Sequence, residues 1–280
     1  MVSSEQRRRQ LARDRYLRQQ QRRAEARRRA RIRNAVIAGG LVLVLAAGGA
    51  YAAAGGLGAG KDKSEDNAAA EPSAPPTSKA PDPCGKPAKG SPGDKQWEKE
   101  PKLAIDTSAT YTMTLETTCG DIVVEMDAAK APHTVNSFDF LVGEGYLDHT
   151  KCHRLVTEGI HVLQCGDPTG TGRGGPGYTI PDENLKDPRV EDGTYPAGTV
   201  AMANTYNAQT GEGRDSGGSQ FFLVYQDSPL PPDYTPFGTV TTGMDVLKKI
   251  ADAGMTPDPQ TGNTAPNATV VIDRATVRKE

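Results

Sequence analysis

The sequence is poor in aromatic residues. Phe, Tyr and Trp together make up 5% of the 280 residues, and there is a single Trp. This excludes one large hydrophobic core over the full length, because domains usually hold about 100–200 residues and a larger core needs more bulky side chains. The composition therefore favours one medium-sized domain with appended segments.

Charge is missing from one long stretch, and the net charge of −2 hides a strong asymmetry. Residues 1–33 contain thirteen Arg, no Lys and three acidic residues, a net of +10. Residues 34–60 contain no charged residue, so the remaining 220 residues carry −12. Such a division indicates a segmented chain rather than a single globule.

The uncharged segment 34–60 has the length of a membrane span. Its apolar centre of about 23 residues exceeds the roughly 20 that a helix needs to cross the hydrocarbon core. A cleaved signal peptide and a buried soluble helix are the alternatives, but the segment starts late and Ala50-Tyr51-Ala52 is a weak cleavage site. We therefore expect a single transmembrane helix in contact with membrane lipid, in the cell membrane.

The flanking charges set the expected orientation. Arg-rich flanks stay on the cytoplasmic side, so residues 1–33 are expected in the cytoplasm and the acidic remainder outside the cell. Such an Arg cluster could also bind nucleic acid or anionic lipid, but it has no apolar stripe and is typical of a solvated helix. We interpret it as a topology signal beside the lipid headgroups and expect no nucleic-acid partner. Residues 61–105, rich in Pro, Ala and charged residues, are predicted to be a flexible linker.

Residues 106–280 have the pattern of a folded domain. Tyr111, Met113 and Leu115 alternate with polar residues and precede a turn, which predicts a hairpin with 122–126. Helices are predicted from Pro132 to about residue 143 and near 243–253. Further short strands are expected at 151–156, 161–166, 198–203, 220–225, 236–240 and 269–277. About eight strands with two helices favour a mainly antiparallel sheet or barrel.

Three local patterns carry no function of their own. Gly170-x-Gly172-x-x-Gly175 matches a dinucleotide pattern but lacks the strand–turn–helix setting. Ser219 lacks the second Gly of a nucleophile elbow. The cluster of His149, Cys152 and His153 has no second ligand pair at a zinc spacing, so no metal site is expected.

Two blocks are more specific. They are CHRLVTEGIHVLQCGD at 152–167, and VAMAN at 200–204 followed by GGSQFFLVY at 217–225. With the TTCGDIVVEM hairpin and the APHTVNSF helix start, they resemble the cyclophilin family of peptidyl-prolyl cis/trans isomerases from about residue 111 to 278. The resemblance implies a mainly β fold, a closed eight-stranded antiparallel barrel capped by two α-helices. It also implies a peptide groove on the outer face and no cofactor.

The resemblance assigns roles residue by residue. Arg154 matches the catalytic arginine. The expected substrate-binding residues are His161, Val162, Gln164, Ala203, Asn204, Gln220, Phe222, Leu230 and Tyr234. The implied activity is isomerisation of X–Pro bonds in proline-containing peptides and unfolded exported proteins, by a monomer that assists their folding. A rival hypothesis is a proline-peptide binding module or holdase with little turnover; a third is recruitment of a cytoplasmic partner by the Arg-rich tail.

The sequence departs from the family pattern around the proline pocket. Two extra residues lie between Arg154 and Gln164, so the usual pocket phenylalanine position falls on Ile160 or His161. The groove tryptophan of the family is absent, with Pro229-Leu230 in its place, and Tyr234 occupies the usual histidine position. We therefore expect weak cyclosporin binding.

Four cysteines allow three pairings. If 151–156 and 161–166 form a hairpin, Cys152 and Cys165 lie across from each other within disulfide reach. Cys119 lies in the first turn, where Cys84 could reach it through the linker. Cys152–Cys165 and Cys84–Cys119 are therefore the predicted disulfides, permitted by an extracellular location.

Overall fold

The computed structural model describes residues 81–257 and 264–280. The predicted cytoplasmic segment, the predicted anchor and residues 61–80 of the predicted linker lie outside the described residues. Within the part of the chain that the structure describes, no helix is both long enough and apolar enough to cross a bilayer.

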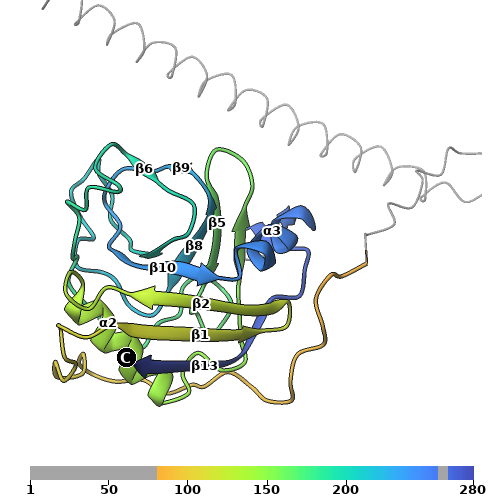
Figure 1. The fold of residues 1–280 in the computed structure, drawn as a ribbon, viewed down its shortest axis with the longest axis horizontal. Helices are drawn as coiled ribbons and strands as arrows, with labels where there is room; N and C mark the ends of the chain where they lie inside the picture. The colour runs from red at the N-terminus through yellow and green to blue at the C-terminus, as the bar shows by residue number, and fades with distance from the viewer. Residues whose placement is uncertain (1–80, 258–263) are drawn as a thin grey trace, which may run out of the picture. The chain divides into compact units, whose positions relative to one another are not determined.

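One curved antiparallel sheet forms the body of the domain (Figure 1). It has nine strands in the order β3-β13-β1-β2-β10-β7-β8-β5-β4. In chain order its strands are β1 (Tyr111–Thr117), β2 (Gly120–Met126), β3 (Thr150–Lys151), β4 (Arg154–Val156), β5 (His161–Cys165), β7 (Thr199–Met202), β8 (Phe221–Gln226), β10 (Pro236–Thr242) and β13 (Val271–Lys279). The predicted strands are therefore present with small shifts at their ends, except the one predicted at 151–156.

The prediction of a closed eight-stranded barrel was wrong, because the sheet is an open half-barrel with β3 and β4 at its two edges. The stretch 151–156, predicted as one strand, is split between these edges. The Cys152 N–H donates to the Val270 carbonyl at 3.0 Å, whereas the His153 N–H donates to the Gln164 carbonyl at 3.1 Å. The chain thus changes partners between two consecutive residues, and no ladder joins the edges.

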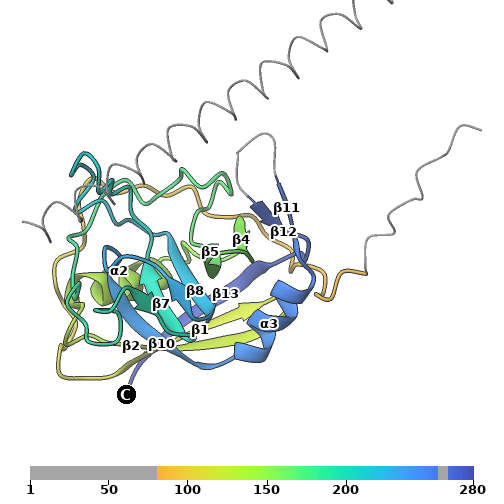
Figure 2. The same ribbon diagram turned by 90° about the horizontal axis from the view of Figure 1, so that it is seen from above.

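Two helices cover the ends of the sheet, α2 (Pro132–Gly143) and α3 (Met244–Asp252) (Figure 2). Pro132 is tolerated at the first position of α2, where its missing N–H would have no partner within the helix. Phe138 of α2 is fully buried, with its ring 4.9 Å from that of Phe237 and 5.4 Å from that of Phe221. The helix therefore packs its apolar face into the interior of the half-barrel.

Two small sheets were not predicted. One pairs β6 (Thr194–Tyr195) with β9 (Ser228–Pro229), and the other pairs β11 (Met255–Pro257) with β12 (Thr264–Pro266). Strands of two or three residues are too short to show an alternating pattern, and three of these four contain Pro.

Residues 81–105, the second part of the predicted flexible linker, pack against the domain. The half-buried Trp97 lies edge-on to Phe140 with ring centres 5.1 Å apart, and its backbone N–H donates to the Pro176 carbonyl at 2.8 Å. The Asn136 side chain binds the carbonyls of Pro101 and Lys102, both at 3.2 Å. One large aromatic side chain and these hydrogen bonds hold a segment that has no regular secondary structure.

Both predicted disulfides are present. Cys84 is bonded to Cys119, which ties residues 81–105 to the β1–β2 turn. Cys152 is bonded to Cys165 beside the β4–β5 pair. The described residues contain no free cysteine.

Candidate active site

Arg154 and Gln164 form the centre of the candidate site. They are directly opposite in the antiparallel register of β4 and β5, so their side chains project from the same face. The Arg154 Nη1 donates to the Gln164 Oε1 at 3.2 Å. The register of β4 and β5 runs without a bulge, so the two predicted site residues face each other directly.

A second glutamine continues the hydrogen bonding. The Gln164 Nε2 donates to the Gln220 Oε1 at 2.9 Å, and the Gln220 Nε2 donates to the Gly174 carbonyl at 2.8 Å. The four groups form one continuous chain of hydrogen bonds from a loop carbonyl to the guanidinium. Each amide in it is held at both its oxygen and its nitrogen.

Arg154 keeps its positive charge although it is partly buried. Burial lowers the pKa of the Arg154 guanidinium, an effect partly opposed by Tyr234. The group nevertheless stays protonated at neutral pH, because an arginine is not deprotonated in proteins. Among the described residues no ion pair involves Arg154, so no carboxylate there neutralises its charge.

An apolar cluster lies next to this polar chain and is separate from the main core. Phe222 is 5% exposed, and its ring is edge-on to that of Tyr234 with centres 5.4 Å apart. The cluster contains the buried residues Val162, Val190, Tyr195, Ala201, Phe222 and Val224, with Val156, Ile160, Ala203, Leu230 and Tyr234 packed against it. Consecutive residues of β8 point to opposite faces, so Phe221 enters the main core while Phe222 lines this cluster.

Five predicted residues therefore share one apolar surface: Val162, Ala203, Phe222, Leu230 and Tyr234. The Cα partners Gln164 and Phe222 join it to the polar chain. His161 lies elsewhere: its ring is edge-on to Tyr225 at 5.6 Å and its N–H donates to the Ser228 hydroxyl. Of the two positions that the sequence left open for the pocket wall, Ile160 is the one that packs against the cluster.

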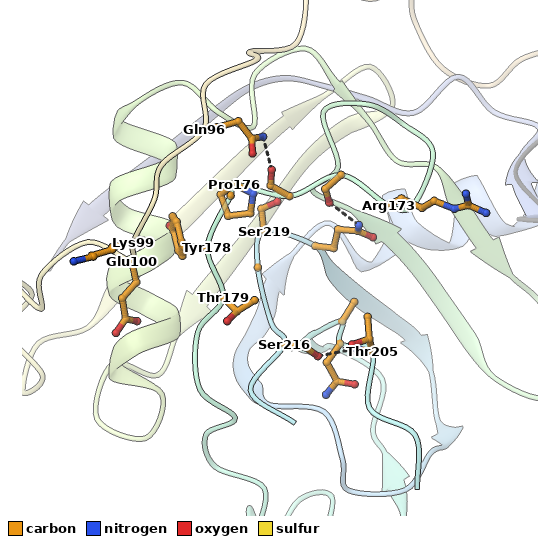
Figure 3. A pocket seen from close by; sticks show the side chains of 18 of the residues that line it. Gln96, Lys99, Glu100, Arg173, Pro176, Tyr178, Thr179, Thr205, Ser216 and Ser219 are labelled. Atoms are coloured by element: carbon orange, nitrogen blue, oxygen red, sulfur yellow. Dashed lines mark hydrogen bonds between the residues drawn. The ribbon is translucent and has the colours of Figure 1, made fainter. Parts of the chain in front are cut away.

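A cavity of about 1060 Å³ adjoins the polar chain (Figure 3). Its walls include Gln164, Gln220, Ala203 and Asn204. The other lining residues include 96, 98–100 and the Gly-rich segment 172–179. The Asn204 Nδ2 donates to the Asp233 carbonyl at 2.8 Å, which ties this side of the cavity to the segment before Tyr234. The cavity is open to solvent and combines apolar surface with the polar side chains of Gln164, Asn204 and Gln220, the combination typical of ligand sites.

Sequence reasoning missed two parts of the site. Tyr195 donates its hydroxyl to the Tyr234 carbonyl at 2.6 Å and accepts the Tyr234 N–H at 3.2 Å, which fixes the backbone beneath the Tyr234 ring. Gly174 contributes only a carbonyl to Gln220. No local sequence pattern indicates either contribution. Tyr195 contacts a residue 39 positions away, and Gly174 acts through its backbone carbonyl.

The residues weighed as metal ligands have other roles. Cys152 is in a disulfide, and His153 is buried with no hydrogen-bond partner for either ring nitrogen. Burial lowers the pKa of His153, which favours the neutral imidazole. In the described ranges no group of three or more His, Cys, Asp or Glu side chains is arranged to hold a metal ion.

The comparisons with known proteins identify the class to which this half-barrel belongs. The family model described as cyclophilin type peptidyl-prolyl cis-trans isomerase matches residues 112–277. The chain therefore belongs to the cyclophilin family.

Similar proteins and a solved structure support the same family assignment. The "Probable peptidyl-prolyl cis-trans isomerase B" of Mycobacterium leprae (strain TN) is 43% identical over 171 residues, which cover 58% of this chain and 56% of that protein. Peptidyl-prolyl cis-trans isomerase B of Bacillus subtilis (strain 168) is 39% identical, over 47% of this chain and 83% of its own length. A Cryptosporidium parvum cyclophilin type isomerase superposes with a TM-score of 0.50 at 26% identity, covering 61% of this chain and 99% of that structure. The match spans little more than half the length of the mycobacterial relative.

Proposed function

We propose that this chain catalyses cis/trans isomerisation of X–Pro peptide bonds. The observation that carries the proposal is Arg154, a cation without an ion pair among the described residues, held by Gln164 beside the apolar cluster of Phe222 and Tyr234. Rotation about an X–Pro bond has a barrier of about 20 kcal/mol, because the C–N bond has partial double-bond character. Rotation breaks no covalent bond and requires no cofactor.

The proposed mechanism uses the two parts of this site. The proline ring enters the apolar cluster, and the proline nitrogen gains a lone pair as it becomes pyramidal. Arg154 donates a hydrogen bond to that nitrogen, while Gln164 and Asn204 hold the peptide backbone. Going from an uncatalysed event of ~10–100 s to a turnover of ~10³ per second needs roughly 6–7 kcal/mol of selective stabilisation. A desolvated, fixed cation and close positioning supply energies of this size.

The decisive experiment compares turnover with binding. The purified full-length chain is assayed by protease-coupled isomerisation of a proline-containing tetrapeptide, with Arg154→Ala and the control Arg274→Ala, an exposed arginine on β13. We expect kcat/KM to fall about 100-fold or more in Arg154→Ala and to stay unchanged in the control. A wild type that binds the peptide but does not accelerate its isomerisation would favour a holdase instead.

We further propose that the substrates are exported proteins and that residues 34–60 anchor the enzyme with its domain outside the cell. The asymmetric charge and the uncharged segment support this, as do the two disulfides, which persist in oxidising compartments. Protease added to intact cells should remove the domain and spare an N-terminal epitope tag. Protection of the domain until the cells are lysed would contradict the orientation.

The enzyme is proposed to act as a monomer and to bind cyclosporin weakly. Leu230 and Tyr234 pack against the apolar cluster. By the family resemblance, a tryptophan and a histidine are expected at these places. Calorimetric titration with cyclosporin measures this directly, and a nanomolar Kd would contradict it. Light scattering on the same sample measures the molar mass and so tests whether the protein is a monomer.

A further inference from the structure

Asp167 organises the loop that follows β5 with a single buried carboxylate. Its Oδ1 accepts the Thr169 N–H and hydroxyl, both at 2.8 Å. Its Oδ2 accepts the backbone N–H groups of Gly172, Arg173 and Gly174 at 2.6, 3.0 and 3.1 Å. Burial opposes ionisation, but these hydrogen bonds lower the pKa of Asp167 below its usual value. The carboxylate is therefore ionised at neutral pH and fixes four backbone N–H groups of one loop.

The last of these groups connects the carboxylate to the candidate active site. Gly174 donates its N–H to Asp167 and accepts the Gln220 Nε2 at its carbonyl, at 2.8 Å. From Gln220 the hydrogen bonds continue through Gln164 to Arg154. Gly174 is thus held by Asp167 through its N–H and holds Gln220 through its carbonyl.

The Gly174 carbonyl and the Arg154 guanidinium, at the two ends of this series of hydrogen bonds, determine the direction of each bond in it. A carbonyl only accepts, so Gln220 must turn its NH₂ group toward Gly174 and its oxygen toward Gln164. Gln164 must then present its own NH₂ group to Gln220 and its oxygen to Arg154, which only donates. The Gly174 carbonyl therefore dictates that an acceptor faces the guanidinium.

Close packing makes Gly174 specific for this arrangement. A Cβ atom at this position would lie 2.0 Å from the Asp167 Oδ1 and 3.0 Å from its Cγ. Any side chain here would push the carboxylate and the loop apart. The loop can approach the carboxylate only as long as this position is glycine.

We propose that Asp167 is a positioning residue for Arg154 and acts through Gly174, Gln220 and Gln164. This inference rests on the proposed isomerase function. Without the carboxylate the Gly174 carbonyl loses its fixed position, and the Gln220 amide is free to turn. Arg154 then loses its oriented acceptor and spends less time aimed at the proline nitrogen. We expect the larger loss in kcat, which depends on the aim of Arg154, because the apolar cluster that binds the ring is untouched.

A double-mutant cycle separates this role from general stabilisation of the loop. Asp167→Asn preserves the size of the side chain and removes its charge, while Gln220→Ala interrupts the chain further along. We expect Asp167→Asn to lower kcat about tenfold in the wild-type chain. In the Gln220→Ala background it should lower kcat less than about twofold, because the route to Arg154 is already broken.

The matched control is Asp148→Asn. Asp148 also holds a backbone N–H, that of Ala275 at 2.8 Å, but has no link to the glutamines. All variants are assayed well below their measured unfolding temperatures. An equal loss from Asp167→Asn in both backgrounds would overturn the proposal, and so would an unchanged kcat in the wild-type chain.

A second measurement does not depend on turnover. The full-length chain labelled with ¹⁵N-arginine gives an Nε–Hε resonance for Arg154, assigned by its loss in Arg154→Lys. Asp167→Asn and Gly174→Ala should shift or broaden this resonance, and Asp148→Asn should leave it in place. An unmoved resonance in both loop variants overturns the positioning role. Absence of isomerase activity in the wild type would instead refute the proposed function. The resonance would still show whether Asp167 positions Arg154.

Discussion

Cys152 and Cys165 are bonded at the end of the β4–β5 pair where Arg154 and Gln164 face each other. Cys165 directly follows Gln164, and Cys152 lies two positions before Arg154. This disulfide holds the point where the chain leaves β3 for β4, at the open side of the half-barrel. It therefore restrains the strand that carries the candidate catalytic arginine.

Removing this disulfide should affect both stability and turnover. The cysteines are 13 positions apart, and loop-closure entropy for such a loop corresponds to about 3 kcal/mol. In the double variant Cys152→Ala/Cys165→Ala the free energy of unfolding should fall by about that amount. Its kcat should fall several-fold. Urea unfolding and the isomerase assay measure the two effects.

The other disulfide is the matched control. Cys84 and Cys119 are 35 positions apart, which corresponds to about 4 kcal/mol. Cys84→Ala/Cys119→Ala should therefore lose at least as much stability while kcat stays near the wild-type value. If this variant loses more turnover than the first, the link between the Cys152–Cys165 bond and Arg154 is wrong.

The neighbouring phenylalanines of β8 offer a test of the two faces of the sheet. Phe222→Ala removes the ring that faces Tyr234, and Phe221→Ala removes the ring that packs against Phe138 in the main core. Each truncation should cost about 3–5 kcal/mol of stability. Only Phe222→Ala should also weaken proline-peptide binding more than tenfold, measured by calorimetry at a temperature where both variants are folded. Equal binding losses would show that the cluster is not the proline pocket.

Arg214 fastens a loop beside the cavity. Its guanidinium lies 3.4 Å from the centre of the Tyr206 ring and pairs with Asp182 at 3.3 Å and with Asp233. Asp233 also provides the carbonyl that orients Asn204. Arg214→Gln should therefore raise KM several-fold for peptides that reach Asn204, with little change in kcat.

The control for this variant is Arg173→Gln, which removes a positive charge from the cavity wall and leaves the Arg214–Asp233 ion pair in place. Initial rates over a range of peptide concentrations separate KM from kcat. A change confined to kcat would contradict a role for Arg214 in holding the binding side of the groove.

Regular elements were predictable from the sequence where their burial alternates. Tyr111, Met113 and Leu115 are buried at every second position of β1, and this pattern alone indicates the strand. The split of 150–156 between two edges has no such signal, because it depends on which distant carbonyl each N–H reaches. The open sheet followed from that split and was therefore missed.

The site was predictable to the extent that motif residues face each other in register. Arg154 and Gln164 are one such pair, so the motif implied their contact. The contributions of Gly174 and Tyr195 are a loop carbonyl and a distant hydroxyl, which sequence patterns do not encode. The exclusion of His161 from the apolar cluster likewise depends on the irregular register between His161 and Val162 opposite β8.

Asp187 makes stability depend on pH in the acidic range. Its carboxylate is 1% exposed and accepts hydrogen bonds from the Arg189 guanidinium and the Asn184 amide. Hydrogen bonding from Arg189, the largest cause, holds the pKa of Asp187 well below its usual value. A carboxylate whose pKa is lower in the folded chain adds stability above its unfolded pKa of about 3.9, and this stability is lost as the pH falls toward the folded value.

Asp187→Asn should therefore destabilise the domain at pH 6 and have a smaller effect at pH 3, where the wild type has already lost part of this contribution. Urea unfolding at both pH values measures the difference between variant and wild type. Glu158→Gln, an exposed carboxylate with no ion pair in the described part of the chain, should change neither value. If the Asp187→Asn deficit is as large at pH 3 as at pH 6, the lost stability comes from packing or hydrogen-bond geometry and not from the ionised carboxylate.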